Sequence, residues 1–249
     1  MTETLSVVVP VFNEAPLVEE LVLQLERELV EGLPDVEVVV VDDASTDETP
    51  QILQRLAHGR PWLHAHRMET NRGHGYSVVS GLDRTRGEWI FQLDSDGQFV
   101  VSDFQELWRR RHEADLVLGV RVRRRDPRHR IVLSHAVRVA VSLLAARRVR
   151  DANTPFRLLR RALWDDLRPS IPPEMLAPSI LVVVGAVARG YRIVEVPVTH
   201  LPRRHGPSSL RSLRLIRFSL RGLDQLVRFR RAIGRTARAP HAAAGGSSR

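Results

Sequence analysis

Two carboxylates one residue apart, Asp94 and Asp96, are the strongest candidates for chemistry in this sequence. They follow the apolar run Trp89–Leu93 and precede Gly97, so they come where a buried strand ends and the chain turns. Carboxylate oxygens in such a place can hold Mg²⁺ or Mn²⁺, which usually also binds substrate phosphates. The tetrapeptide Asp-Ser-Asp-Gly is equally typical of a tight turn. Taken alone, the pair fits both a metal site and a surface turn.

The elements that would position these carboxylates alternate between strands and helices. Each early strand pattern ends in polar residues: Leu5–Val11 before Asn13-Glu14, Val36–Val41 before Asp42-Asp43, and Trp89–Leu93 before Asp94. Helical spacings of apolar residues fill the intervals, and Ser45-Thr46-Asp47-Glu48 matches a capping box that would open the second helix. This alternation predicts a parallel sheet whose strand ends share one edge. We therefore expect the polar groups to converge on one cleft.

The rest of the chain is less regular but continues the α/β pattern. Further strands are expected near 63–67, 116–119, 156–159 and 193–198, and helices over 132–147 and 210–231. The fold class is therefore α/β, with a mostly parallel sheet flanked by helices and a C-terminal amphipathic helix.

Composition narrows the possible classes of protein. The chain has 249 residues, 43% of them hydrophobic, and no cysteine, which excludes disulfides, zinc-thiolate sites and thiol nucleophiles. All 38 basic residues are arginine, and they gather in 109–130, 147–161 and 203–235, which predicts an anionic partner approached from the C-terminal side. Aromatic residues make up only 5%, which argues against nucleic acid. Without a basic leader or a long apolar run, we expect a cytoplasmic protein.

Four motifs resemble those of the inverting family 2 glycosyltransferases. They are Val-Val-Val-Pro-Val-Phe-Asn-Glu at 7–14, Val-Val-Asp-Asp-Ala-Ser-Thr-Asp at 40–47, Asn-Arg-Gly-His-Gly at 71–75 and Leu-Asp-Ser-Asp-Gly-Gln at 93–98. Within that family the chain is most similar to the branch of dolichol-phosphate mannosyltransferases and polyprenyl-phosphate glycosyltransferases. The matching segments are 119–121, Arg130 with Ser134, 151–157 and 202–209. The resemblance implies a GT-A fold, a Rossmann-like sheet that binds a nucleotide sugar.

The resemblance also assigns donor-side roles. It implies that the base and ribose are lined by Pro10, Phe12, Glu14 and Asp43, and that Gly73 and Gly75 let the backbone approach the nucleotide. Asp94 would contact the ribose and, with Asp96 and Gln98, a Mg²⁺ or Mn²⁺ ion that stabilises charge developing on the diphosphate. The expected reaction moves one hexose from a donor of the GDP-mannose or UDP-glucose type to polyprenyl phosphate.

On the acceptor side the resemblance points to arginines. The acceptor phosphate would be bound by Arg121, Arg130 and Ser134, and Arg203 would close over it. A phosphate is already ionised near neutral pH and needs no strong base. If the acceptor were instead a soluble hydroxyl, a base would be required, and Asp151 could serve or could be structural. The arginine run can also be read as a solvated loop.

The C-terminal part leaves two interpretations open. An apolar stripe (Leu213, Ile216, Leu220, Leu223, Val227) runs beside an arginine stripe, which is typical of a helix on an anionic membrane surface. We favour peripheral contact of 210–231 with the inner face of the plasma membrane slightly over packing on the domain or on a second subunit. We divide the chain into a catalytic domain 1–209 (a nucleotide-binding half 1–100 and an acceptor half 101–209), the basic amphipathic helix 210–235 and a disordered tail 236–249.

Overall fold

The computed structural model describes residues 3–122, 149–202 and 212–235, the side chains of 212–220, 223 and 234–235 excepted. One sheet runs through it in the order β3-β2-β1-β4-β6-β5-β7. Its strands are β1 Leu5–Val11, β2 Val36–Asp42, β3 Leu63–Arg67, β4 Trp89–Gln92, β5 Leu116–Val122, β6 Arg157–Arg160 and β7 Ile193–Thr199. Neighbouring strands are parallel except around β6, which runs antiparallel to both β4 and β5. The mostly parallel sheet that we predicted is therefore confirmed.

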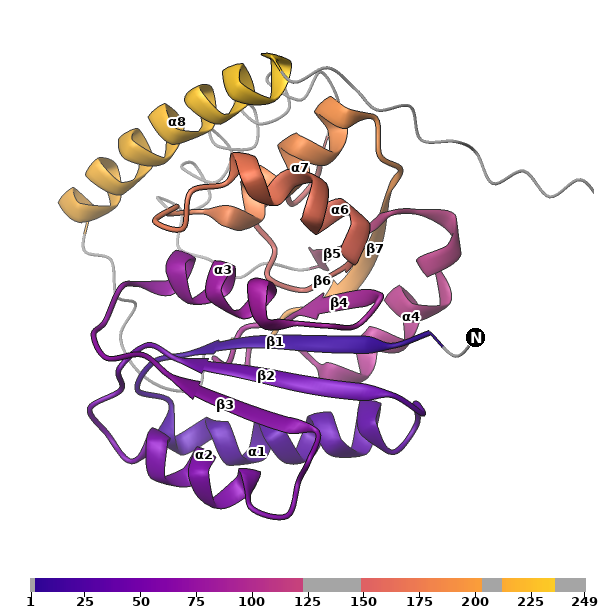
Figure 1. Cartoon of the computed structure of the whole chain (residues 1–249), viewed down its shortest axis with the longest axis vertical. Coiled ribbons are helices and arrows are strands. Elements are labelled where there is room, and N and C mark those ends of the chain that lie inside the picture. The colour runs from indigo at the N-terminus through magenta and orange to yellow at the C-terminus, as the bar shows by residue number, and fades with distance from the viewer. Residues whose placement is uncertain (1–2, 123–148, 203–211, 236–249) are drawn as a thin grey trace, which may run out of the picture.

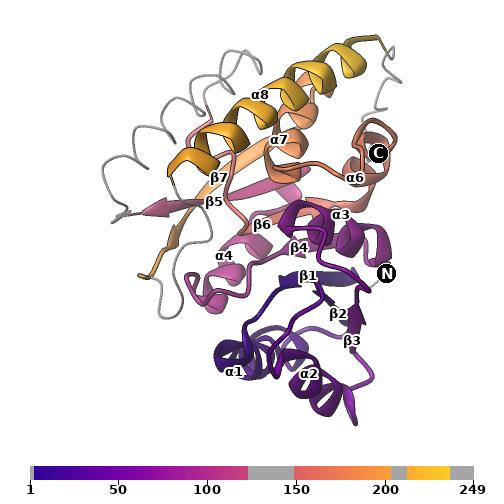
Figure 2. The ribbon, with the colours of Figure 1, turned by 90° about the vertical axis from the view of Figure 1, so that its left-hand side faces the viewer.

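Helices cover both faces of the sheet (Figure 1). The α-helices are α1 Ala15–Leu25, α2 Thr49–Ala57, α3 His74–Arg84, α4 Phe104–Arg109, α6 Arg161–Leu167, α7 Pro178–Arg189 and α8 Ser212–Arg235. Single turns of other helix types are η1 Glu26–Val30, η2 Val101–Asp103, η3 Arg111–Glu113 and η4 Arg168–Ser170. Helices α1, α2 and α4 pack on one face, while α3, α6 and α7 pack on the other, with α8 outermost over α7 (Figures 1 and 2).

The valine run of β1 shows why these segments form strands. Val7 and Val9 belong to the core on the α1 side, whereas Val8 belongs to the core on the α3 side. Because successive side chains point to opposite faces, a strand covered on both faces must be apolar at every position. Residues 38–42 of β2 and all of β4 are buried likewise, and the parallel pairing of both strands with β1 places their polar ends at one edge of the sheet.

The predicted capping box is wrong. Helix α2 begins at Thr49, and Ser45 instead accepts the N–H of Asn13 on its hydroxyl at 2.9 Å. Asp47 serves both helix starts, because its two oxygens accept the N–H groups of Thr49 (3.0 Å) and Ala15 (3.1 Å). Burial acts to raise the pKa of Asp47, but these hydrogen bonds outweigh it and lower the pKa. Contacts with the distant loop after β1 thus replace the local cap.

The second half of α8 packs on the domain. Leu226, Phe229 and Ile233 are buried in the core that also contains α7, and Gln225 accepts the N–H of Leu176 at 3.1 Å. This half of α8 therefore follows the second of our two interpretations, a helix that packs on the domain. The buried register differs from the predicted stripe, since Val227 is only half-buried. No helix within the described ranges is long and apolar enough to span a membrane.

Candidate active site

The carboxyl ends of β1, β2 and β4 lie side by side, as predicted. The N–H of Asp43 donates to the carbonyl of Val11 at 2.9 Å, which joins the end of β2 to that of β1. Ser95, which lies between Asp94 and Asp96 in the sequence, is buried, and its hydroxyl donates to the carbonyl of Pro10 at 2.9 Å. The donor-side residues therefore share one edge of the sheet.

Asp43 holds the start of α3 in place. Its side chain is only 2% exposed, and its two oxygens accept the N–H groups of Arg72 and Gly73, both at 2.8 Å. Gly73 has φ 89°, a left-handed conformation that favours glycine. Asp43 thus shapes the loop that faces the cleft, and its predicted contact with the nucleotide stays a prediction.

Asp94 carries a buried carboxylate oxygen without a hydrogen bond. Its Oδ1 accepts none from the described part of the chain, and it lies 3.7 Å from His74 Nε2. Asp96 Oδ1 accepts the N–H of Gln98 at 3.1 Å. A buried acceptor without a donor requires an explanation, and a divalent cation supplies one. Within the described ranges, no three His, Cys, Asp or Glu side chains gather to hold a metal. Two carboxylates fit an ion completed by substrate phosphates.

The other residues predicted for the donor side differ in exposure. Phe12 is 45% exposed at the end of β1, although it is a large aromatic, while Pro10 is buried and Glu14 half-buried. Gln98 donates its side-chain amide to the carbonyl of Leu201 at 3.2 Å, and Leu201 N–H returns a bond to Gln98 at 2.8 Å. Gln98 thereby ties the segment after β7 to the Asp94-Asp96 turn.

On the acceptor side the structure brings two predicted residues together. Arg121, on β5, and Asp151 form a bidentate pair, with Nε–Oδ2 at 2.6 Å and a second bond at 2.8 Å. Their side chains are 13% and 7% exposed. A carboxylate held by both arms of a guanidinium is a positioning partner rather than a free base. Arg130, Ser134 and Arg203 lie outside the described residues.

Sequence reasoning missed Arg157, the most deeply buried cation of the site. It is 1% exposed at the start of β6, opposite Gln92 of β4 and Leu118 of β5. Its guanidinium donates to the carbonyls of Ala152, Thr154 and Ser179. Burial lowers the pKa of Arg157 to about 9, against the opposing effect of the Asp151 and Asp94 carboxylates. The sequence does contain a sign of this buried cation, because an arginine interrupts the apolar segment 156–159.

Comparison with known proteins decides the family. The model of the family described as "Glycosyl transferase family 2" matches residues 6–169. The chain belongs to glycosyl transferase family 2. Our resemblance is thus confirmed, and the first hundred residues, where the four motifs lie, fall almost entirely within the match.

Relatives of this family 2 chain include two enzymes named for polyprenyl phosphates. The chain is 28% identical to an undecaprenyl-phosphate 4-deoxy-4-formamido-L-arabinose transferase of Pseudomonas fluorescens, over 85% of this chain and 61% of the relative. It is also 28% identical to a dolichyl-phosphate beta-glucosyltransferase of Trichomonas vaginalis, over 77% of this chain and 62% of the relative. The chain therefore spans about three fifths of the length of these relatives.

Solved structures confirm the GT-A fold. A mannosyltransferase from Pyrobaculum calidifontis, in complex with GDP-Man and Mn²⁺, is 25% identical with a TM-score of 0.62, covering 96% of this chain and 66% of its own. A glucosyl-3-phosphoglycerate synthase from Mycobacterium tuberculosis, in complex with Mn²⁺, UDP and glucosyl-3-phosphoglycerate, is 18% identical with a TM-score of 0.67. This second alignment covers 91% of this chain and 80% of that enzyme.

Gly75, expected to let the nucleotide approach the backbone, has a different close neighbour in this family 2 chain. A side chain there would collide with the carbonyl of Met175. Gly75→Ala is therefore expected to displace α3 from the 175 segment and to lower stability by about 1–3 kcal/mol. Thermal unfolding measures the loss. Gly222→Ala in α8 is the control, since its methyl meets open space and gains about 1 kcal/mol of helix propensity. Equal stability of Gly75→Ala and the wild type would contradict this contact.

Proposed function

We propose that this chain is a metal-dependent, inverting glycosyltransferase that moves one hexose from a nucleoside-diphosphate sugar to polyprenyl phosphate. The observation that carries the proposal is the arrangement of charges at one sheet edge. The carboxylates Asp94 and Asp96 follow β4, and the Arg121–Asp151 pair stands at the end of β5. Since β4 and β5 run in the same direction on either side of β6, both ends lie at the same edge of the sheet.

The donor half of this proposal rests on the strand ends. Phe12 offers an exposed aromatic ring to a base, and the loop held by Asp43 presents the start of α3 to phosphates. Asp94 and Asp96, with Gln98 beside them, would hold Mg²⁺ or Mn²⁺, and the bound ion would supply charge stabilisation to the departing diphosphate. We propose a donor of the GDP-mannose or UDP-glucose type.

The acceptor half rests on Arg121. Its planar guanidinium suits phosphate oxygens, and the two hydrogen bonds that it donates to Asp151 fix its orientation. An ionised phosphate can attack the sugar without a general base. Because both oxygens of Asp151 are occupied by Arg121, a soluble hydroxyl acceptor would lack the base that we had considered for it. Arg130, Ser134 and Arg203 remain proposed partners of the acceptor phosphate.

An assay with a lipid acceptor tests this function. The protein is incubated with Mn²⁺, labelled GDP-mannose or UDP-glucose, and undecaprenyl phosphate, and the lipid phase is counted. We expect label in the lipid with undecaprenyl phosphate and none with undecaprenol, because the attacking group is the phosphate. Removing the metal with EDTA is expected to stop transfer. Label that stays in the aqueous phase with every donor would contradict the proposed acceptor.

Arg121 provides the matched variant for the same assay. Arg121→Gln removes the cation that would bind the acceptor, so we expect a rise of roughly tenfold or more in the KM for undecaprenyl phosphate with little change in the KM for the donor. Arg150→Gln is the control, because Arg150 is exposed and its nearest acid is Glu195 at 3.7 Å. An unchanged acceptor KM in Arg121→Gln would remove Arg121 from the acceptor site.

A further inference from the structure

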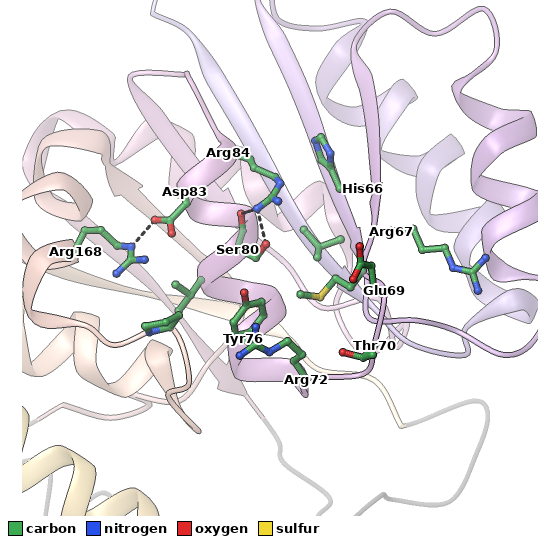
Figure 3. A pocket seen from close by; sticks show the side chains of 14 residues that line it. His66, Arg67, Glu69, Thr70, Arg72, Tyr76, Ser80, Asp83, Arg84 and Arg168 are labelled. Atoms are coloured by element: carbon green, nitrogen blue, oxygen red, sulfur yellow. Dashed lines mark hydrogen bonds and ion pairs between the residues drawn. The ribbon is translucent and has the colours of Figure 1, made fainter.

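A second hollow lies between α3 and the edge strand β3, apart from the carboxylates after β4. Its volume is about 550 Å³, within the range of small-molecule sites. Side chains of β3, of the loop 68–72 and of α3 form its walls, and Arg168 and Pro173 close one side (Figure 3). We call this hollow the α3 groove. Neither the Asp94-Asp96 turn nor the Arg121–Asp151 pair lines it.

One end of the α3 groove carries two exposed basic side chains, Arg84 and His66. Arg84 donates to the carbonyl and hydroxyl of Ser80, at 2.9 and 2.5 Å, and pairs with no carboxylate of the described residues. His66 lies at the same end (Figure 3). Partial desolvation, followed by the nearby charges of Arg84 and His64, lowers the pKa of His66. An anion near both groups would favour the protonated form of the imidazole.

The other arginines of the groove are already paired with acids, and one further carboxylate, the exposed Glu69, also lines the groove. Arg168 binds Asp83 at 2.6 Å, and Arg72 binds Glu174 at 2.6 Å. Arg67 lies 3.6 Å from an oxygen of Asp42. Among the arginines of the groove, the one that pairs with no carboxylate of the described residues is therefore Arg84.

The floor of the groove suits an apolar or planar body. Val41, Met68 and Val79 line it, together with the ring of Tyr76. The guanidinium of Arg72 stacks on that ring, 4.0 Å from its centroid. A flat ligand can lie against such a surface while its charged group reaches Arg84.

We propose that the α3 groove binds a small phosphate monoester with a planar apolar body. The arginine fork of Arg84, the hydroxyl of Ser80 and the imidazole of His66 would hold the phosphate. The body would rest against Tyr76 and Met68. This site is separate from the proposed donor and acceptor sites, so it stands or falls independently of the proposed function.

Phenyl phosphate is the probe, titrated calorimetrically into the full chain in the absence of metal. We expect saturable binding that Arg84→Gln weakens roughly tenfold or more, the loss of one charge-assisted contact. Arg86→Gln is the matched control, an exposed arginine outside the groove, and should bind as the wild type does. Asp94→Asn should also bind normally. Phenol, which lacks the anion, should not bind, and inorganic phosphate should bind more weakly than phenyl phosphate.

Three outcomes would overturn the site. They are an absence of saturation with phenyl phosphate, equal weakening by Arg84→Gln and Arg86→Gln, and loss of binding in Asp94→Asn with Arg84→Gln unaffected. The second would indicate attraction by overall charge, and the third would place the probe at the donor edge. Circular dichroism of each variant checks that the fold is kept.

Discussion

Asp94→Asn is expected to lower kcat for sugar transfer by about a hundredfold or more while leaving the protein as stable as the wild type. The two expectations come from one observation. Asp94 Oδ1 is buried but accepts no hydrogen bond from the described part of the chain, so an asparagine there breaks no hydrogen bond of that oxygen. The lost attraction to Arg157 is offset by relief from burying the charge. An asparagine would remove that charge from the proposed metal and diphosphate site. Steady-state kinetics with a Mn²⁺ titration and thermal unfolding measure the two effects.

Asp115→Asn is the matched control for this experiment. Asp115 precedes β5 at the opposite edge of the sheet, and its carboxylate accepts the N–H of Arg192 at 2.9 Å. Its replacement should reduce stability and leave kcat close to that of the wild type. Full turnover in Asp94→Asn would contradict the metal assignment. A loss of activity that only follows a loss of folding would show Asp94 to be structural.

The parts of the site that could be predicted are those that depend on local pattern. A strand buried on both faces must be apolar throughout, so the valine runs of β1 and β2 are visible in the sequence, as are the polar residues that end them. Parallel strands then place those ends at one edge. The convergence of Asp43 and Asp94 followed from these two rules alone.

The parts that could not be predicted depend on partners far apart in the chain. Asp151 accepts hydrogen bonds from the guanidinium of Arg121, which lies 30 residues away in the sequence. Asp43 accepts the N–H of Gly73 across the same distance in sequence. Asp47 accepts backbone N–H groups at the starts of two helices, so the prediction of a local capping box was wrong. No periodicity encodes such pairs, because they arise only when the sheet brings the segments together. The antiparallel direction of β6 was hidden for the same reason.

Arg157→Met is expected to cost about 3–5 kcal/mol of folding free energy, a large share of a domain's total stability. The guanidinium bridges the 152–154 loop and Ser179 in α7, so methionine would fill the volume but leave buried carbonyls without donors. Because Arg157 lies between the Asp94 and Arg121 strands, the loss should also loosen the acceptor half. Urea unfolding measures the stability, with the wild type alongside.

Arg160→Met separates this effect from the general loss of an arginine in β6. Arg160 is half-buried, binds Glu88 at 3.2 Å and lies over the ring of Trp89 at 4.5 Å, so its removal should cost only about 1 kcal/mol or less. Arg157→Lys keeps the charge but lacks the planar fork, and we expect stability between that of the wild type and Arg157→Met. If Arg157→Met and Arg160→Met unfold at the same urea concentration, the carbonyls are satisfied without the buried guanidinium. If they differ as expected, one cation that local sequence rules did not find holds the two halves of the site in register.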